Sequence, residues 1–209
     1  MTDMLTVEAA RTAVLERIHA LGDEQVPLAD ALDRHLANDV AAIADNPPHD
    51  NSAMDGYAVR AADVAEVPAT LTQIGESAAG NAFGGKVGPG QTARIFTGAP
   101  VPKGADAIVM QEDTEVAGDQ ITMTVAPWPG KFVRPAGLDF QLGDVGITAN
   151  RVLSSRDVGL AAAMNVPWLT VARRPRIALL ATGDEIVRPG EPVGPNQIIS
   201  SNTLALMGL

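Results

Sequence analysis

The chain has 209 residues, of which 46% are hydrophobic and only 3% aromatic, so it is long enough for two ordinary domains with aliphatic cores. Its formal net charge of −10 argues against binding to nucleic acid or to an acidic membrane, because a basic surface supplies most of that affinity. It contains no cysteine, which excludes disulfides, thiolate nucleophiles and cysteine-based zinc sites and suits a reducing cytoplasm.

The first part of the chain predicts an amphipathic helix. Apolar residues recur there at steps of three and four, namely Val7, Ala10, Val14, Ile18 and Leu21. This spacing places them on one helical face, with Thr6 as the N-cap and Gly22 as the stop. Because charged residues interrupt the apolar ones, the segment is neither a signal peptide nor a membrane span, and we expect a cytoplasmic protein.

A second short helix is predicted from Pro27, with Leu28, Leu32 and Leu36 on one face. The sequence DNPP at residues 45–48 then ends the helical pattern, since two prolines fit neither a helix nor a central strand. We expect a domain boundary close to this point.

Short β-type runs separated by glycine and proline follow, at residues 70–74, 92–96, 107–111 and 121–125. This spacing is typical of a small all-β domain. Residues 80–86, GNAFGGK, match the glycine and lysine spacing of a phosphate-binding loop. Val87 stands where that motif needs Ser or Thr, and the following glycines and proline prevent a helix, so we interpret the segment as a hairpin loop.

The last part of the chain predicts a helix, then a strand, a further strand and a second helix. Ser154 begins a capping box for a helix through Met164, which Asn165 ends in a left-handed conformation. Trp168–Ala172 is predicted as a strand. The apolar run IALLA, residues 177–181, predicts a strand buried on both faces of a parallel sheet, and a final helix is expected to begin near Thr203.

Residues 50–57, DNSAMDGY, place two carboxylates, an amide and a hydroxyl within one short segment. In the simplest interpretation Asp50 and Ser52 cap a turn and Asp55-Gly56 forms a hairpin. In the functional interpretation one carboxylate lies on a loop where it binds a metal ion or holds a water molecule. The spacing alone leaves both open.

Three further motifs likewise allow either a structural or a functional interpretation. Thr97-Gly98 follows a predicted strand, where a hydroxyl beside glycine lets backbone N–H groups approach an anion, although an ordinary strand end fits as well. Residues 182–185, TGDE, follow the predicted parallel strand at the edge where α/β sheets bind ligands, and two acids there favour magnesium over a merely solvated turn. Residues 134–140 taken alone predict a turn with a surface ion pair between Arg134 and Asp139.

Taken together and in order, these blocks resemble the molybdopterin molybdenumtransferase family, which includes bacterial MoeA proteins and the gephyrin E domain. The blocks are DNSAMDGYAV, RIFTGAPVPKGADAIVMQED, VRPAGLDF and RPRIALLATGDEIVRPGEPVGPNQI. The resemblance covers the family's N-terminal half. It implies molybdenum cofactor biosynthesis, by Mg²⁺-dependent insertion of molybdate into adenylylated molybdopterin with release of AMP.

The resemblance also implies roles for particular residues. Catalytic roles fall to Asp55, Glu185, Thr97 and Asp139. Substrate-binding roles fall to Asn51, Ser52, Gly98, Thr182, Gly183 and Asp184. Candidate metal ligands are Asp55, Asp184 and Glu185. The chain departs from the usual family pattern at His49, Leu138 and Ser200, and the last change removes a possible anion or metal contact.

The fold implied is multidomain, α+β and β. A helical and extended domain comprises residues 1–46 and 136–173, a small β domain is inserted at 47–135, and residues 174–209 are the truncated start of a parallel α/β molybdopterin-binding domain. The implied partners are a second copy of the chain and the molybdopterin adenylyltransferase, with the active site between two subunits. The chain alone is expected to be inactive. The alternative is a non-catalytic scaffold or dimerisation module of the same architecture.

Overall fold

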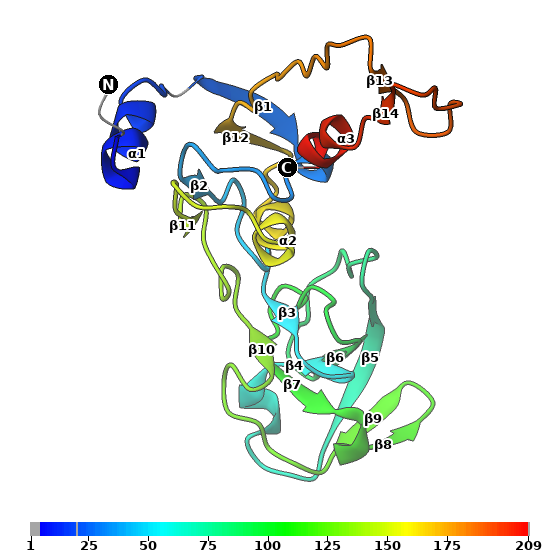
Figure 1. Ribbon diagram of the computed structural model, residues 1–209. Helices are drawn as coiled ribbons and strands as arrows, with labels where there is room; N and C mark the ends of the chain where they lie inside the picture. Colours follow the sequence, from blue (N-terminus) through cyan, green and yellow to red (C-terminus); the bar gives the residue numbers. More distant parts are fainter. Residues whose placement is uncertain (1–4, 20, 209) are drawn as a thin grey trace. The chain divides into compact units, whose positions relative to one another are not determined.

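The computed structural model describes residues 5–19 and 21–208, which fall into two compact units. One unit is Asp23–Ala172, and the other combines the chain before it, to Gly22, with the chain after it, from Arg173. Figure 1 follows the elements of both. The outer limits of the predicted domains, residues 1 and 209, lie outside the described residues.

The largest element of the unit Asp23–Ala172 is a mixed sheet in the order β7-β4-β6-β5-β9-β8 (Figure 1). Its strands are β4 (Gly56–Val59), β5 (Ala69–Ser77), β6 (Gln91–Ile95), β7 (Ala107–Met110), β8 (Thr114–Ala117) and β9 (Gln120–Met123). Neighbouring strands are antiparallel, except that β5 and β6 run parallel. The strands predicted at 70–74, 92–96, 107–111 and 121–125 are thereby confirmed as β5, β6, β7 and β9.

Strand β4 is buried along its whole length. Successive side chains of a strand point to opposite faces of the sheet. Tyr57 and Val59 accordingly pack into one apolar cluster, with Ile121 among its members, while Ala58 packs into another beside Ile95. The sequence GYAV suits a strand buried on both faces, and the loop that precedes it is therefore attached to a fixed part of the sheet.

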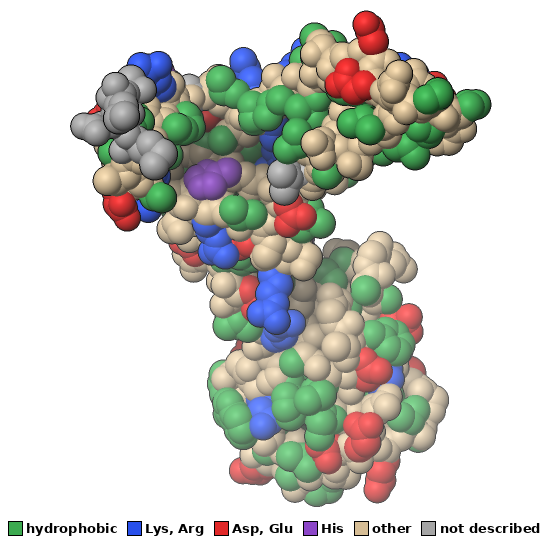
Figure 2. All heavy atoms as spheres, viewed as in Figure 1, with side chains coloured by type: hydrophobic (Ala, Val, Ile, Leu, Met, Phe, Trp, Pro, Cys, Tyr) green, Lys and Arg blue, Asp and Glu red, His purple; other side chains and the backbone are tan. Residues whose placement is uncertain are grey.

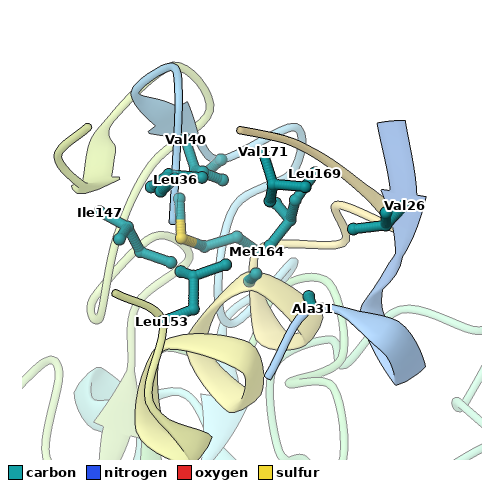
Figure 3. Close-up of a cluster of buried hydrophobic side chains, with 11 residues drawn as sticks. Val26, Ala31, Leu36, Val40, Ile147, Leu153, Met164, Leu169 and Val171 are labelled. Carbon is teal, nitrogen blue, oxygen red and sulfur yellow. The ribbon is translucent and has the colours of Figure 1, made fainter. Parts of the chain in front are cut away.

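A separate core is built from elements that precede and follow the sheet in sequence. These elements are β1 (Asp23–Pro27), β2 (Val40–Ala41), β11 (Val145–Ile147), α2 (Ser155–Ala163) and β12 (Trp168–Ala172). β1 pairs with β12, and β2 with β11, both antiparallel. Figure 3 shows Leu36, Leu153 and Met164 among the side chains that meet in this core, and all of them are fully buried or nearly so.

Helix α2 begins as predicted. The Ser154 hydroxyl accepts a hydrogen bond from the N–H of Asp157, and the Asp157 carboxylate accepts one from the N–H of Ser154, which completes the capping box. Asn165 follows the helix with φ +63°, also as predicted. The strand at Trp168–Ala172 is confirmed as β12.

Two of the predicted helices differ from the structure. The helix from Pro27 is wrong, because Pro27 ends strand β1 and only a short 3-10 turn, η1 (Leu28–Asp30), follows. Asp33, with φ +59°, cannot continue a helix. Helix α1 (Val7–Leu15) starts after Thr6 as predicted, but it ends well before the predicted stop at Gly22.

The second unit contains few regular elements after Arg173. They are β13 (Ile186–Val187), its parallel partner β14 (Ile198–Ile199), and α3 (Asn202–Met207), which confirms the helix predicted near Thr203. The strand predicted at residues 177–181 is wrong, since that segment is irregular and leaves Leu180 86% exposed. The remaining short elements, all in the first unit, are β3 (Asn51–Ser52), β10 (Val133–Arg134), η2 (Ala61–Val64) and η3 (Gln111–Asp113).

Acidic side chains outnumber basic ones, with 25 Asp and Glu against 15 Lys and Arg. Figure 2 shows acidic side chains spread over the region of the six-stranded sheet, with hydrophobic ones between them. Within residues 5–19 and 21–208, every helix is too short or too polar to cross a bilayer.

Candidate functional site

Residues 50–57 connect directly to two of the other motif blocks. Strand β3, Asn51–Ser52, pairs with β10, Val133–Arg134, which leads into the RPAG block. On the other side, the N–H of Ser52 donates to the carbonyl of Ala99 (2.9 Å), and the N–H of Gly98 donates to the carbonyl of Ser52 (2.8 Å). Segments widely separated in sequence therefore meet at the DNSAMDGY segment.

The carboxylate of Asp55 is held by Thr97. Its Oδ1 accepts hydrogen bonds from the Thr97 backbone N–H (2.7 Å) and from the Thr97 hydroxyl (2.8 Å). Bonds donated to a carboxylate favour its charged form. The pKa of Asp55 is accordingly lowered, most by the backbone bond, next by the hydroxyl bond and least by the charge of Arg94. Burial acts in the opposite direction and offsets part of this lowering. Both bonds go to Oδ1, and Asp55 as a whole residue is exposed.

The TGAP turn binds this carboxylate in place of an external anion. The sequence left two interpretations open for this turn, N–H groups that approach an anion or an ordinary strand end. In the structure the N–H of Thr97 donates to Asp55, that of Gly98 to Ser52, and that of Ala99 to the carbonyl of Phe96. The acceptors therefore come from the protein itself, and the anion that the turn meets in the structure is the Asp55 carboxylate. Gly98 adopts φ +81°, which glycine permits without strain.

Gly56 fixes how close the loop comes to strand β7. A Cβ atom at this position would lie 2.0 Å from the carbonyl oxygen of Val109, which is main chain and has little room to move. The N–H of Gln111 also donates to the carbonyl of Asp55 (3.1 Å). The backbone on both sides of the Asp55–Gly56 bond therefore lies tightly against the sheet.

The other predicted site residues of this region differ in the hydrogen bonds and ion pairs that their side chains form. Ser52 is buried and donates its hydroxyl to the carbonyl of Met54 (2.6 Å), so its donor is used within the loop. Among the described residues, Asn51 Oδ1 is a buried side-chain atom without a hydrogen-bond partner. Asp139 forms the predicted ion pair with Arg134 (3.2 Å), with both side chains about half exposed.

Sequence reasoning missed Arg94 and Gln111. The guanidinium of Arg94 lies 5.1 Å from the ring centroid of Tyr57 and 4.9 Å from that of Phe96. It also donates to the carbonyl of Gly56 (3.2 Å) and to Oε1 of Gln111 (2.5 Å). The available signal was a single arginine in the otherwise uncharged run TARIF, in the strand predicted at residues 92–96.

The TGDE block belongs to the other unit. It directly precedes strand β13, and the residues just before it are irregular. Its predicted place at the carboxyl end of a parallel strand is therefore wrong. Thr182, Asp184 and Glu185 are exposed. Gly183 has φ +136°, and a Cβ there would lie 2.3 Å from Oε2 of Glu185, so the carboxylate folds back over its own turn. A cavity of about 600 Å³ beside Gly183 is lined mainly by apolar side chains.

A metal ion would find only part of its coordination shell here. Within residues 5–19 and 21–208, no three His, Asp or Glu side chains lie close enough to hold a metal by themselves. Mg²⁺ accepts one or two carboxylates and completes its shell with water and substrate phosphates. The hard, anionic oxygen of Asp55 fits that pattern, and so do the adjacent carboxylates of Asp184 and Glu185.

Comparisons with known proteins agree on one family. Residues 5–165 match the family model for the MoeA N-terminal region (domain I and II). The chain is 40% identical to the molybdopterin molybdenumtransferase of Nostoc sp., over 100% of this chain and 50% of that protein. It is 37% identical to molybdopterin molybdenumtransferase 2 of Mycobacterium tuberculosis, over 97% of this chain and 51% of that protein.

The fold comparison agrees with the sequence comparison. A crystal structure of the molybdopterin biosynthesis MoeA protein from Pyrococcus horikosii aligns with a TM-score of 0.81 and 34% identity. The alignment covers 98% of this chain and 53% of that one. The chain thus spans about half the length of the curated relatives it matches.

Proposed function

The chain belongs to the MoeA family, with residues 5–165 corresponding to the family's N-terminal region, and from this premise we propose that it acts in molybdenum cofactor biosynthesis as a molybdopterin molybdenumtransferase. The proposed reaction inserts molybdate into adenylylated molybdopterin and releases AMP. The names of the relatives support the reaction class. The observation that carries the proposal is the exposed Asp55 carboxylate, held by two hydrogen bonds from Thr97.

The charge of Asp55 explains why the proposal includes Mg²⁺. A carboxylate beside an anionic phosphate anhydride is repelled unless a cation lies between them. Bound Mg²⁺ would screen the phosphates and polarise the anhydride. The bonds from Thr97 stabilise the ionised form of Asp55 and occupy Oδ1, and we propose Oδ2 as the metal ligand. Asp184 and Glu185 are the other proposed ligands, and no nucleophilic side chain is required.

The other residues support this reaction in different ways. Following the resemblance, we assign Asn51 to substrate binding, and Thr182, Gly183 and Asp184 through the open turn that they form. The polar groups of Ser52 and Gly98 are bonded inside the protein, so their contribution is to shape the loop around Asp55. The catalytic role that the resemblance gives to Asp139 would be carried by a carboxylate that is paired with Arg134.

Domain limits near residues 47, 135 and 174 belong to the same proposal. Their support is that one apolar core uses residues up to Ala42 and from Ile147, while the other two cores use residues between Tyr57 and Val133. Following the resemblance, we further propose a cytoplasmic homodimer that completes the active site between subunits and receives its substrate from the adenylyltransferase.

The test is a matched pair of substitutions in the complete gene product. Asp55→Asn removes the charge and keeps the shape, and we expect molybdate- and Mg²⁺-dependent release of AMP to fall about 10²–10³-fold. Asp50→Asn is the control, since the Asp50 carboxylate accepts the N–H of Ala136 (2.9 Å) and asparagine keeps that acceptor. It should stay near wild type. Circular dichroism and urea unfolding verify that both variants fold.

Two outcomes would contradict the proposal. Unchanged turnover of Asp55→Asn removes Asp55 from the mechanism. Near-normal cofactor synthesis after joint substitution of Asp55 and Glu185, together with its loss when residues 47–135 are deleted, would instead identify a scaffold module.

A further inference from the structure

Arg94 occupies a central place behind the Asp55 loop. It lies on β6 directly opposite Tyr57 of β4. Its guanidinium lies near the rings of both Tyr57 and Phe96, at 5.1 Å and 4.9 Å from their centroids. Contacts with two aromatic rings restrict the orientation of a planar guanidinium, because both stacking and cation–π attraction depend on it.

The hydrogen bonds of Arg94 reach both sides of the Asp55–Gly56 peptide. One nitrogen donates directly to the carbonyl of Gly56 (3.2 Å). The other donates to Oε1 of Gln111 (2.5 Å), and the backbone N–H of Gln111 donates to the carbonyl of Asp55 (3.1 Å). Arg94 therefore binds one of the two carbonyls itself and the other through Gln111.

The opposite side of the same backbone is also confined. Gly56 has no room for a Cβ atom because the carbonyl of Val109 lies against it. Thr97, which binds the Asp55 carboxylate, directly follows Phe96, one of the rings beside the guanidinium. The same short segment, residues 94–97, thus holds both the backbone and the carboxylate of Asp55.

We propose that Arg94 is a positioning residue for Asp55, which fixes the Asp55–Gly56 backbone so that the carboxylate meets Thr97, and which does not itself touch the substrate. The inference rests on the proposed role of Asp55. Arg94 is only partly exposed, and its bonds go to protein oxygens. Displacing a reacting group by about 1 Å can cost about 10²-fold in rate, so a residue that acts only through backbone contacts can still be essential.

Lysine should not replace this arginine. Lysine keeps the charge, but it lacks the planar fork that donates to Gly56 and Gln111 together and stacks on the rings. If Arg94 attracted a substrate anion by charge alone, Arg94→Lys would retain most of the activity. If Arg94 positions Asp55, Arg94→Lys and Arg94→Gln should both lose most of the activity.

The experiment combines kinetics with an observable that does not depend on turnover, both in the complete gene product. We expect each Arg94 variant to lower kcat for AMP release at least about tenfold, with KM for adenylylated molybdopterin almost unchanged. The amide proton of Thr97, which donates to Asp55, should move upfield in the NMR spectrum as its bond weakens. Arg60→Gln is the control, because the Arg60 side chain forms a 3.8 Å ion pair with Asp63, away from the Asp55 contacts, and its loss should change neither observable.

Several results would overturn the inference. A raised KM with normal kcat, or recovery by Arg94→Lys, would place Arg94 in contact with the substrate. An unshifted Thr97 amide in Arg94→Lys would show that Arg94 does not position Asp55. Should Arg94→Gln unfold, the lysine variant, which keeps the charge, decides the matter. If the wild-type protein releases no AMP, the proposed function fails while the amide shift still tests the positioning.

Discussion

Residues 23–172 and residues 173–208 both contain aliphatic side chains, but the first region buries them and the second leaves several of them exposed. In the first region Leu36, Ile121 and Leu153 are completely buried. In the second, Ile177 and Leu180 stay 77% and 86% exposed, although they belong to the most continuous apolar run of that region. A run of this kind becomes a buried strand only where neighbouring strands bond it and other layers cover it. Among the described residues from 173 onward, the regular elements are β13, β14 and α3.

The two acidic motifs show the same contrast. Asp55 accepts hydrogen bonds from a residue 42 positions away, and its carbonyl accepts the N–H of Gln111, which directly follows strand β7. Glu185 instead lies over Gly183 within its own turn. A motif in the packed region thus has its carboxylate held by a distant part of the chain, whereas the carbonyls of the TGDE turn accept hydrogen bonds from Gln197 and Ile198 and its Glu185 carboxylate meets its own turn.

The largest predicted effect tests the comparison directly. In the 209-residue chain, Leu36→Ala should lower the free energy of unfolding by about 2–5 kcal/mol, because it leaves a cavity in a closed core. Leu180→Ala removes the same atoms from an exposed side chain and should change it by less than about 0.5 kcal/mol. Urea unfolding followed by circular dichroism measures both. Equal losses would show that the second region is packed after all.

A smaller effect sharpens the comparison inside the packed region. Gly56→Ala should cost about 1–3 kcal/mol or more, since its Cβ meets the main chain of Val109. Gly159→Ala is the matched control, because the same atom added in helix α2 meets nothing within 4 Å. It should stabilise by about 0.5–1 kcal/mol through helix propensity. A stable Gly56→Ala protein would mean that the loop is looser than its contacts indicate.

The smallest effect compares two capped helices. Ser154→Ala removes the cap of α2, which packs into a core, and should cost about 1 kcal/mol in the free energy of unfolding. Thr6→Ala removes the cap of α1, which has no buried residue, and should leave global unfolding nearly unchanged. Local helix loss should appear only as faster amide exchange in α1. A comparable global loss from Thr6→Ala would place α1 in the cooperative structure.

Local patterns predicted the elements whose signals are contained within a few residues. Four short strands between glycine-rich turns were predicted and confirmed, and so was the capping box at Ser154. The helix from Pro27 was wrong because β1 is formed by pairing with β12, at the far end of the same unit. Leu28 and Leu36 reach the same core without an α-helix, the first from the 3-10 turn η1 and the second from an isolated β-bridge to Val171.

The site shows the same limit. The residue pattern and the family resemblance selected Asp55 and Thr97, but no spacing rule places a hydrogen bond between them. Arg94 was missed because a lone arginine in a strand gives no sign of the rings and carbonyls that surround it. The TGDE turn was placed by analogy with a parallel sheet edge, which requires the strand that residues 177–181 do not form.

The central claim is that Thr97 serves the reaction by holding Asp55, and a double-mutant cycle tests it most directly. Thr97→Val removes the hydroxyl bond but keeps the side-chain shape, and it would be combined with Asp55→Asn in the complete gene product. We predict that Thr97→Val lowers kcat/KM for AMP release about tenfold in the wild-type background and has almost no further effect beside Asp55→Asn. Equal, additive losses in both backgrounds would contradict the claim.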